Sequence, residues 1–201
     1  MVLESSPESR IYAGLKPGTT AENLRHSITN GAIEDHLSYF TPKSGDAVFL
    51  LAGTVHALGG DIVVFEVQQN SDVTYSLFDW NHIDKKTSQP RTLQIDKAIA
   101  CTDFAQGIAS PLIPEEVTIV PAKREQLFSC EHFVLWRING EFDALDLPRV
   151  LVCLEGNGML EHAGILYAVR KGDVFLLPAV TGVCAFRPEE PVTVLEIAPL
   201  V

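Results

Sequence analysis

A ten-residue pattern occurs twice in this chain and constrains its fold more than any other feature. The first copy reads KSGDAVFLLA (43–52), and the second reads RKGDVFLLPA (170–179). Each copy has a basic residue, a Gly-Asp pair and an apolar run with Phe-Leu-Leu, and each ends in a small residue. A Gly-Asp turn before a buried strand, repeated over 100 positions later, predicts two copies of one all-β module.

The second half of the chain is predicted to be almost entirely β. Short apolar or alternating segments recur at the spacing that is typical of a sandwich or barrel. The predicted strands are 118–121, 126–129, 133–139, 149–155, 158–161, 165–169, 173–177, 183–186 and 192–197.

The first half is predicted to be a mixed module. Thr19 and Glu22 match a capping box, which predicts a helix over 20–29. A second short helix is predicted over 32–37. These helices form an insertion at 19–37, and Asp96 is predicted to cap another helix over 97–101. The predicted strands are 10–15, 46–51, 62–68, 74–78 and 92–95. We therefore divide the chain into a first module (1–102), a linker (103–116) with low periodicity, and a second module (117–201).

Composition narrows the function classes. The net charge of -11 and the pI near 4.9 argue against nucleic acid or an anionic membrane as a partner. The start of the chain has no basic and apolar signal pattern, and no run is as long as a membrane span, so we expect a cytoplasmic protein. The four cysteines are widely spaced, and we expect them to be buried apolar residues rather than disulfide or zinc partners.

His56 is the histidine best placed for chemistry. It lies between glycine turns at Gly53 and Gly59, where a strand ends and the backbone bends. A gap-free alignment of the two Phe-Leu-Leu segments puts Gly182 opposite His56. Because glycine offers no ligand, only the first module is predicted to carry a site.

The repeated Gly-Asp turn and buried strand look like the second sequence motif of the cupin barrel, a small double-stranded jelly roll. In order along the chain, IYAGLKPG, PKSGDAVFLLAGTVHALGG, FEVQQNSDVTYSLFDW and QPRTLQIDKAI resemble the type I mannose-6-phosphate isomerases. The resemblance covers essentially the whole chain. It implies two cupin modules, of which the first is N-terminally incomplete, and interconversion of mannose 6-phosphate and fructose 6-phosphate with a metal, usually zinc.

The resemblance also implies a set of metal ligands. The histidine of the AGTVHA segment falls on His56, so the resemblance implies that His56 is a metal ligand. The alternative is that His56 is an unliganded histidine in the pocket. The other three family ligands come from a Gln-x-His pair and a Lys-x-Glu segment that lie upstream of the segment matched by Met1. We therefore expect this chain to lack three of the four ligands.

Two positively charged groups of the family are also replaced. Members usually have an arginine after the SDxTY run and a second basic residue six positions on, and these positions hold Ser76 and His82 here. Serine has no permanent charge and no bidentate fork, and histidine is cationic only part of the time near neutral pH.

The candidate substrate-binding residues are Glu66, Gln68, Asp72 and Arg91. Glu66 and Gln68 alternate on one strand and are expected on one face, where they either bind sugar hydroxyls or are solvated. Asp72 is expected to shape the turn beside the pocket. Arg91 either attracts a phosphate or belongs to a solvated loop.

Two functions follow from these observations. The first is a mannose-6-phosphate isomerase homologue that is impaired or inactive as an isolated chain. The alternative is a non-catalytic cupin protein that binds a sugar phosphate or has a regulatory role. A jelly roll without its first strands exposes sheet edges and apolar surface, so we expect a homo-oligomer or a partner that completes the first module.

Overall fold

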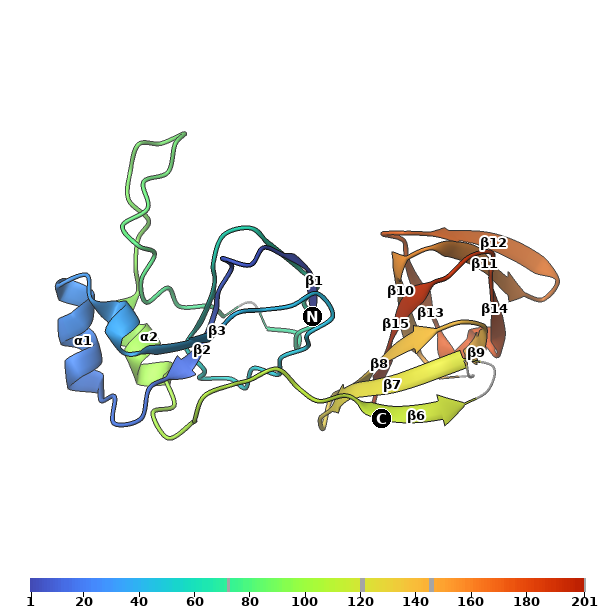
Figure 1. The fold of residues 1–201 in the computed structure, drawn as a ribbon, viewed down its shortest axis with the longest axis horizontal. Coiled ribbons are helices and arrows are strands. Elements are labelled where there is room, and N and C mark those ends of the chain that lie inside the picture. The colour runs from blue at the N-terminus through green and yellow to red at the C-terminus, as the bar shows by residue number, and fades with distance from the viewer. Residues whose placement is uncertain (72, 120–121, 145–146, 201) are drawn as a thin grey trace. The chain divides into compact units, whose positions relative to one another are not determined.

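The computed structural model describes residues 1–71, 73–119, 122–144 and 147–200. The chain divides into two compact units, Met1–Pro111 and Leu112–Val201 (Figure 1). Both units are built on antiparallel strands, as the fold class predicts. Residues 103–114 form no helix or strand.

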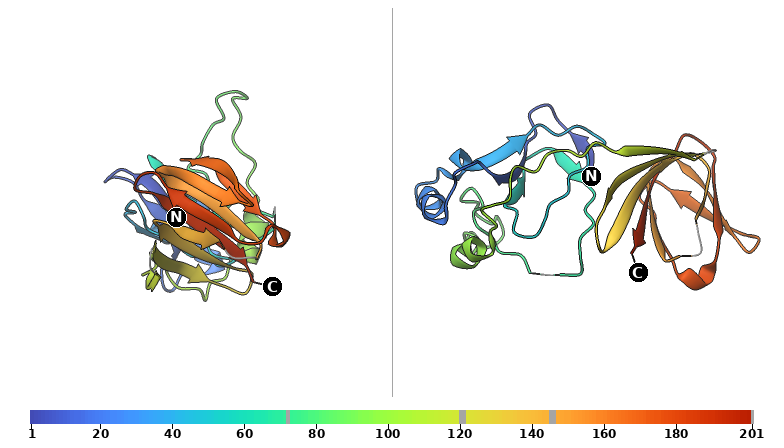
Figure 2. Two further views of the ribbon diagram at one scale, coloured as in Figure 1. Left: turned by 90° about the vertical axis from the view of Figure 1, so that its right-hand side faces the viewer. Right: turned by 90° about the horizontal axis from the view of Figure 1, so that it is seen from below.

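The second unit is a β-sandwich of two antiparallel sheets (Figures 1 and 2). One sheet has the order β13-β10-β15-β8-β7-β6, and the other has the order β12-β11-β14-β9. The six strands of the first sheet are β6 (Glu115–Ile119), β7 (Ala122–Ser129), β8 (Phe133–Asn139), β10 (Arg149–Glu155), β13 (Val174–Leu177) and β15 (Thr193–Pro199). The four strands of the second are β9 (Phe142–Ala144), β11 (Asn157–His162), β12 (Ile165–Arg170) and β14 (Cys184–Pro188).

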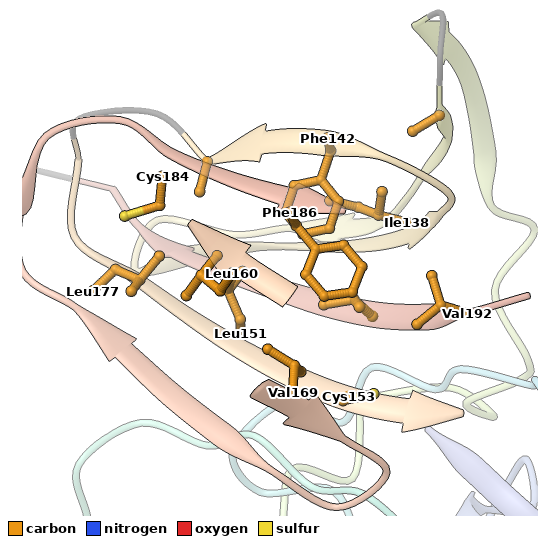
Figure 3. Packing of buried hydrophobic residues seen from close by; sticks show 13 residues of the cluster. Ile138, Phe142, Leu151, Cys153, Leu160, Val169, Leu177, Cys184, Phe186 and Val192 are labelled. Carbon is orange, nitrogen blue, oxygen red and sulfur yellow. The ribbon is translucent and has the colours of Figure 1, made fainter. Parts of the chain in front are cut away.

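Apolar side chains fill the space between these two sheets. Phe142 and Phe186 stack with ring centroids 5.2 Å apart, and Phe186 is only 1% exposed. Leu151 and Leu160 pack against them from the two sheets (Figure 3). The interior of the second unit is therefore a solid core.

The first unit has smaller sheets and a helical layer. β1 (Val2–Ser5) pairs with β5 (Ile62–Val64), and a second sheet has the order β3-β2-β4. Its strands are β2 (Ile11–Leu15), β3 (Leu37–Phe40) and β4 (His56–Leu58), and the helical elements are α1 (Ala21–Thr29), α2 (Ile95–Cys101) and the 3₁₀ turn η1 (Ile33–Asp35). The insertion that contains α1 and η1 connects β2 to β3.

The capping box of α1 lies one residue later than predicted. Thr20, not Thr19, caps the helix, and its partner is Asn23 rather than Glu22. The Thr19 hydroxyl donates to the carbonyl of Lys16 at 2.8 Å, so it is already used in the preceding turn. The Asn23 side chain accepts from the Thr20 amide at 2.7 Å, which is the role that glutamate or glutamine usually has.

Four predicted strands of the first unit are absent or much shorter than predicted. Residues 46–51 and 74–78 form no strand, and 62–68 is a strand only over Ile62–Val64. Ser76 instead exchanges hydrogen bonds with Gln94, whose amide donates to the Ser76 carbonyl at 2.9 Å. Because Gln94 is the N-terminal cap of α2, the strand predicted over 92–95 is absent and the helix starts at Ile95.

Other boundaries also differ. The second helix predicted over 32–37 is the single turn η1, because Leu37 already enters β3. Asp96 does not cap α2 and instead pairs with Arg25 at 2.5 Å. Cys101 is exposed, against the prediction, whereas Cys153 and Cys184 are buried. Burial raises the pKa of both buried thiols.

The repeated sequence pattern is also a repeat of atomic contacts. In each Gly-Asp turn the backbone amide of the aspartate donates to the carbonyl of the first residue of the turn. Asp46 donates to Lys43 at 3.0 Å, and Asp173 donates to Arg170 at 2.9 Å. In each turn the aspartate side chain accepts from the amide of that same first residue at 2.8 Å. The glycine of each turn has a φ of 91°, which only glycine adopts readily.

The strand registers extend the repeat beyond this turn. β2 lies between β3 and β4 as β11 lies between β12 and β14. The backbone amide of Gly59 donates to the carbonyl of Arg10, and the backbone amide of Glu189 donates to the carbonyl of Asn157 in the same way. From this match, His56, which pairs with Ala13, corresponds to Phe186, which pairs with Leu160. The gap-free alignment that put Gly182 opposite His56 is wrong, because the connections that lead into β4 and β14 differ in length.

Candidate functional site

His56 begins β4, and the backbone of Thr54 holds its ring in one orientation. Its Nδ1 atom lies 2.9 Å from the carbonyl oxygen of Thr54. A carbonyl only accepts, so in the neutral ring Nδ1 carries the proton and Nε2 keeps its lone pair. A histidine that is fixed in this way presents Nε2 to a metal ion or an acidic proton.

The register of β4 determines the face on which His56 lies. Directly paired residues of antiparallel strands share a face, and His56 pairs with Ala13, which is only 1% exposed. Ala13 packs in a small apolar cluster with Val2 and Ile11. The corresponding residue of the second unit, Phe186, points into the core. His56 therefore projects from the inner face of the first unit, yet its side chain is exposed.

Glu66 and Gln68 lie just beyond β5 and are both exposed. They correspond to Glu196 and Ala198 of β15, because Val64 pairs with Val2 as Val194 pairs with Cys153. Burial lowers the pKa of the Met1 ammonium group, and the negative charge of Glu66 offsets part of this effect.

The second unit has a charged cluster at the equivalent place, and sequence reasoning missed it. Glu196 is 0% exposed, and its Oε1 lies 2.6 Å from the Nε of Arg149. Arg124 contacts the other carboxylate oxygen and lies over the ring of Trp136, 5.1 Å from its centroid. A lone glutamate in the apolar strand Thr193–Pro199 was the available signal.

The remaining predicted site residues that the structure describes lie outside helices and strands. Ser76 is partly buried between Tyr75 and Leu77, both of which pack toward the helices. His82 and Arg91 belong to the exposed segment 81–91, which extends away from the strands of the first unit (Figure 1). Asp72 lies outside the described residues. The structure thus places His56 on a strand and Glu66 and Gln68 just beyond one, and it does not place His82 or Arg91 on a strand.

The described residues do not fit a zinc ion. Zinc sites use three or four protein ligands. Among residues 1–71, 73–119, 122–144 and 147–200, no group of three or more His, Cys, Asp or Glu side chains is arranged to hold a metal ion. His56 offers one ligand atom, which is too few.

The fold and the repeat define the class of protein, which is a chain of two cupin-type β units with a candidate site in the first. Within the described part of the chain, no helix is long and apolar enough to cross a membrane. A search of protein-family models found no match.

The chain is similar in sequence and in fold to known mannose-6-phosphate isomerases. It is 33% identical over 186 residues to the mannose-6-phosphate isomerase ManA of Bacillus subtilis, which covers 88% of this chain and 56% of ManA. It is 31% identical over 161 residues to the mannose-6-phosphate isomerase of Streptococcus mutans, covering 78% of this chain and 50% of that protein. The crystal structure of the Bacillus subtilis mannose 6-phosphate isomerase matches the fold with a TM-score of 0.87 and 24% identity, covering 98% of this chain and 62% of that one.

The chain is therefore a homologue of the mannose-6-phosphate isomerases. It spans about half the length of the curated relatives that it matches.

Proposed function

We propose that this chain forms one side of a mannose-6-phosphate isomerase site, and that alone it interconverts mannose 6-phosphate and fructose 6-phosphate slowly or not at all. One observation carries the proposal. His56 projects from the inner face of a cupin unit, with Nε2 available, in a chain whose sequence and fold match this class of isomerase.

The roles of the chain's own residues follow from their positions. Nε2 of His56 binds a metal ion or accepts a proton, and the hydrogen bond to the Thr54 carbonyl keeps the ring from turning. Glu66 and Gln68 present acceptors and donors to sugar hydroxyl groups from the segment that follows β5. Zinc, the metal implied by the family, would supply charge stabilisation only if further ligands joined His56.

Two features limit catalysis by the isolated chain. His56 alone binds zinc poorly, since a site needs three or four ligands. Ser76 replaces an arginine, so the developing negative charge of an enediolate lacks a fixed cation there.

A coupled isomerase assay with added zinc, together with metal analysis of the purified chain, tests this proposal. We expect turnover at the background level and well under one zinc per chain. Robust turnover that disappears in His56→Ala but persists in His132→Ala would contradict it. His132 is a suitable control because it is an exposed histidine of the second unit.

The alternative function is binding or sensing of a sugar phosphate without isomerisation. The serine at position 76 favours it, because binding does not need the catalytic arginine. Calorimetry with mannose 6-phosphate separates the isomerase from the binding protein. A binding protein alone should show saturable binding that Glu66→Ala weakens, and no turnover under any condition.

We also propose that the first unit is completed by a partner, either a second copy or a separate chain, and that the protein acts in the cytoplasm without nucleic acid or membrane partners. The inner face of the first unit supports a partner, because it exposes His56 and Leu58. Size-exclusion chromatography with light scattering tests it. A monomer with a sharp, cooperative thermal transition across both units would contradict it.

A further inference from the structure

The buried carboxylate of the second unit shows what this position of the fold requires. Glu196 lies on the inner face of β15, where its direct neighbours in the sheet are Leu151 on β10 and Trp136 on β8. Two guanidinium groups, those of Arg149 and Arg124, neutralise it. A buried carboxylate without such partners would carry a large desolvation penalty.

Glu66 occupies the same position in the first unit. Both strand pairs shift register at the same place, between Val2 and Glu4 in one unit and between Cys153 and Glu155 in the other. The next residue, Phe65, then exchanges two backbone hydrogen bonds of 2.8 Å with Met1. Since side chains alternate, Glu66 faces the inside of the first unit as Glu196 faces the inside of the second.

The surroundings of these two carboxylates differ. Glu66 is exposed, and among the described residues no ion pair includes it. β15 lies between β10 and β8, whereas β5 pairs with β1 alone in the described part of the chain. The edge that continues β5 is therefore open in the described part of the chain. The Met1 ammonium group is the positive charge whose pKa Glu66 influences, but the two form no ion pair, and no arginine or lysine of the described residues pairs with Glu66.

We propose that this open edge accepts an antiparallel β-strand or hairpin that carries an arginine or lysine against Glu66. This inference rests on the proposed completion of the first unit and specifies its chemistry. The added strand pairs with the segment after Val64 as β8 pairs with β15, and its cation takes the place that Arg124 and Arg149 take beside Glu196. An apolar strand without a cation is rejected, because it would bury Glu66 unpaired.

The probe for the test is the part of Bacillus subtilis ManA that this chain does not match, produced with an affinity tag together with the full chain. We expect the wild-type chain to co-purify with it. We expect Glu66→Lys to bind at least ten-fold more weakly, because a docked cation would then meet a like charge. Glu8→Lys is the matched control, since Glu8 is also exposed in the first unit and undergoes the same charge change. It should bind like the wild type.

Hydrogen exchange supplies a second readout on the same samples. Strand addition slows exchange of the amides in residues 62–69, and Glu66→Lys removes that protection while leaving the thermal transition of the free chain unchanged. The inference is overturned if the wild-type chain binds no ManA segment, or if Glu66→Lys binds as tightly as the wild type. Binding that depends on Glu66 but yields no isomerase turnover would refute the proposed function and support this inference.

Discussion

Replacing Glu196 by glutamine should destabilise the second unit strongly. The substitution keeps the size of the side chain but removes the charge that Arg149 and Arg124 share. The Arg149 side chain is 8% exposed and the Arg124 side chain is 17% exposed, so neither guanidinium reaches water freely. Removing one partner of a buried ion pair costs about 3–5 kcal/mol. Because Arg124 is partly exposed, we expect a value near the lower end, about 3 kcal/mol.

Urea unfolding followed by tryptophan fluorescence measures this loss unit by unit. The chain has two tryptophans, Trp80 in the first unit and Trp136 in the second. In a Trp80→Phe background the signal comes from Trp136, which lies beside Arg124. With a urea dependence of about 1–3 kcal/mol/M, the loss lowers the midpoint by about 1–3 M.

A compensating variant makes the prediction sharper. Replacing all three charged residues together by leucine at 196 and methionine at 124 and 149 should restore most of the stability, since apolar side chains of similar volume often replace a buried ion cluster at little cost. A Glu196→Gln variant that loses less than about 1 kcal/mol would refute the reasoning that this charge is paired inside the unit.

Three further predictions concern the fold. In thermal melts, Gly156→Ala should destabilise the second unit clearly more than Gly164→Ala. Both glycines have a positive φ near 75°, but a Cβ at 156 would meet the backbone of Pro191, whereas a Cβ at 164 meets nothing within 4 Å. Equal losses of stability would contradict this prediction. A thiol reagent under native conditions should modify the exposed Cys101 quickly and the buried Cys153 and Cys184 only after unfolding, as mass spectrometry would show; rapid native labelling of Cys184 would contradict it. Despite burial, which raises it, hydrogen bonds from Arg137 and Lys123 hold the pKa of Glu125 below 4.5 in the folded chain; its contribution to stability should therefore be present above about pH 4.5 and lost as pH falls through the folded pKa, and Glu125→Gln should flatten that part of the stability-against-pH curve.

The all-β second unit was largely predictable because its strands alternate in hydrophobicity. The strand Ala122–Ser129 was predicted only from 126 onward, since its first half is charged. In the structure this charge is used across the sheet, with Glu125 facing Arg137 at 2.6 Å and Arg124 reaching Glu196. A charged run therefore concealed a strand that faces a buried carboxylate. The short strand Phe142–Ala144 was missed because three residues show no period.

The first unit was harder to predict because sequence pattern does not show which strands find a neighbour. Residues 46–51 have the same apolar pattern as β13, yet they form no ladder in the described residues, while β13 pairs with β10. The Gly-Asp turn itself was predictable to the residue, because its glycine and aspartate have local roles in the backbone.

The candidate site was predictable in part. His56 could be singled out from its glycine turns, and its orientation by Thr54 needed coordinates. The correspondence of His56 with Phe186 and of Glu66 with Glu196 could not be read from the sequence, because the connecting segments of the two units differ in length. Only the hydrogen-bonded registers of the strands reveal it.

The most direct test of the proposed function is a coupled mannose-6-phosphate isomerase assay on four samples with zinc. These are the chain alone, the chain with the remaining part of ManA, and the same two samples carrying His56→Ala. We predict background turnover for the chain alone and measurable turnover for the wild-type mixture, which His56→Ala abolishes. Turnover by the chain alone that His56→Ala removes, or a well-formed mixture that binds mannose 6-phosphate without converting it, would contradict the account.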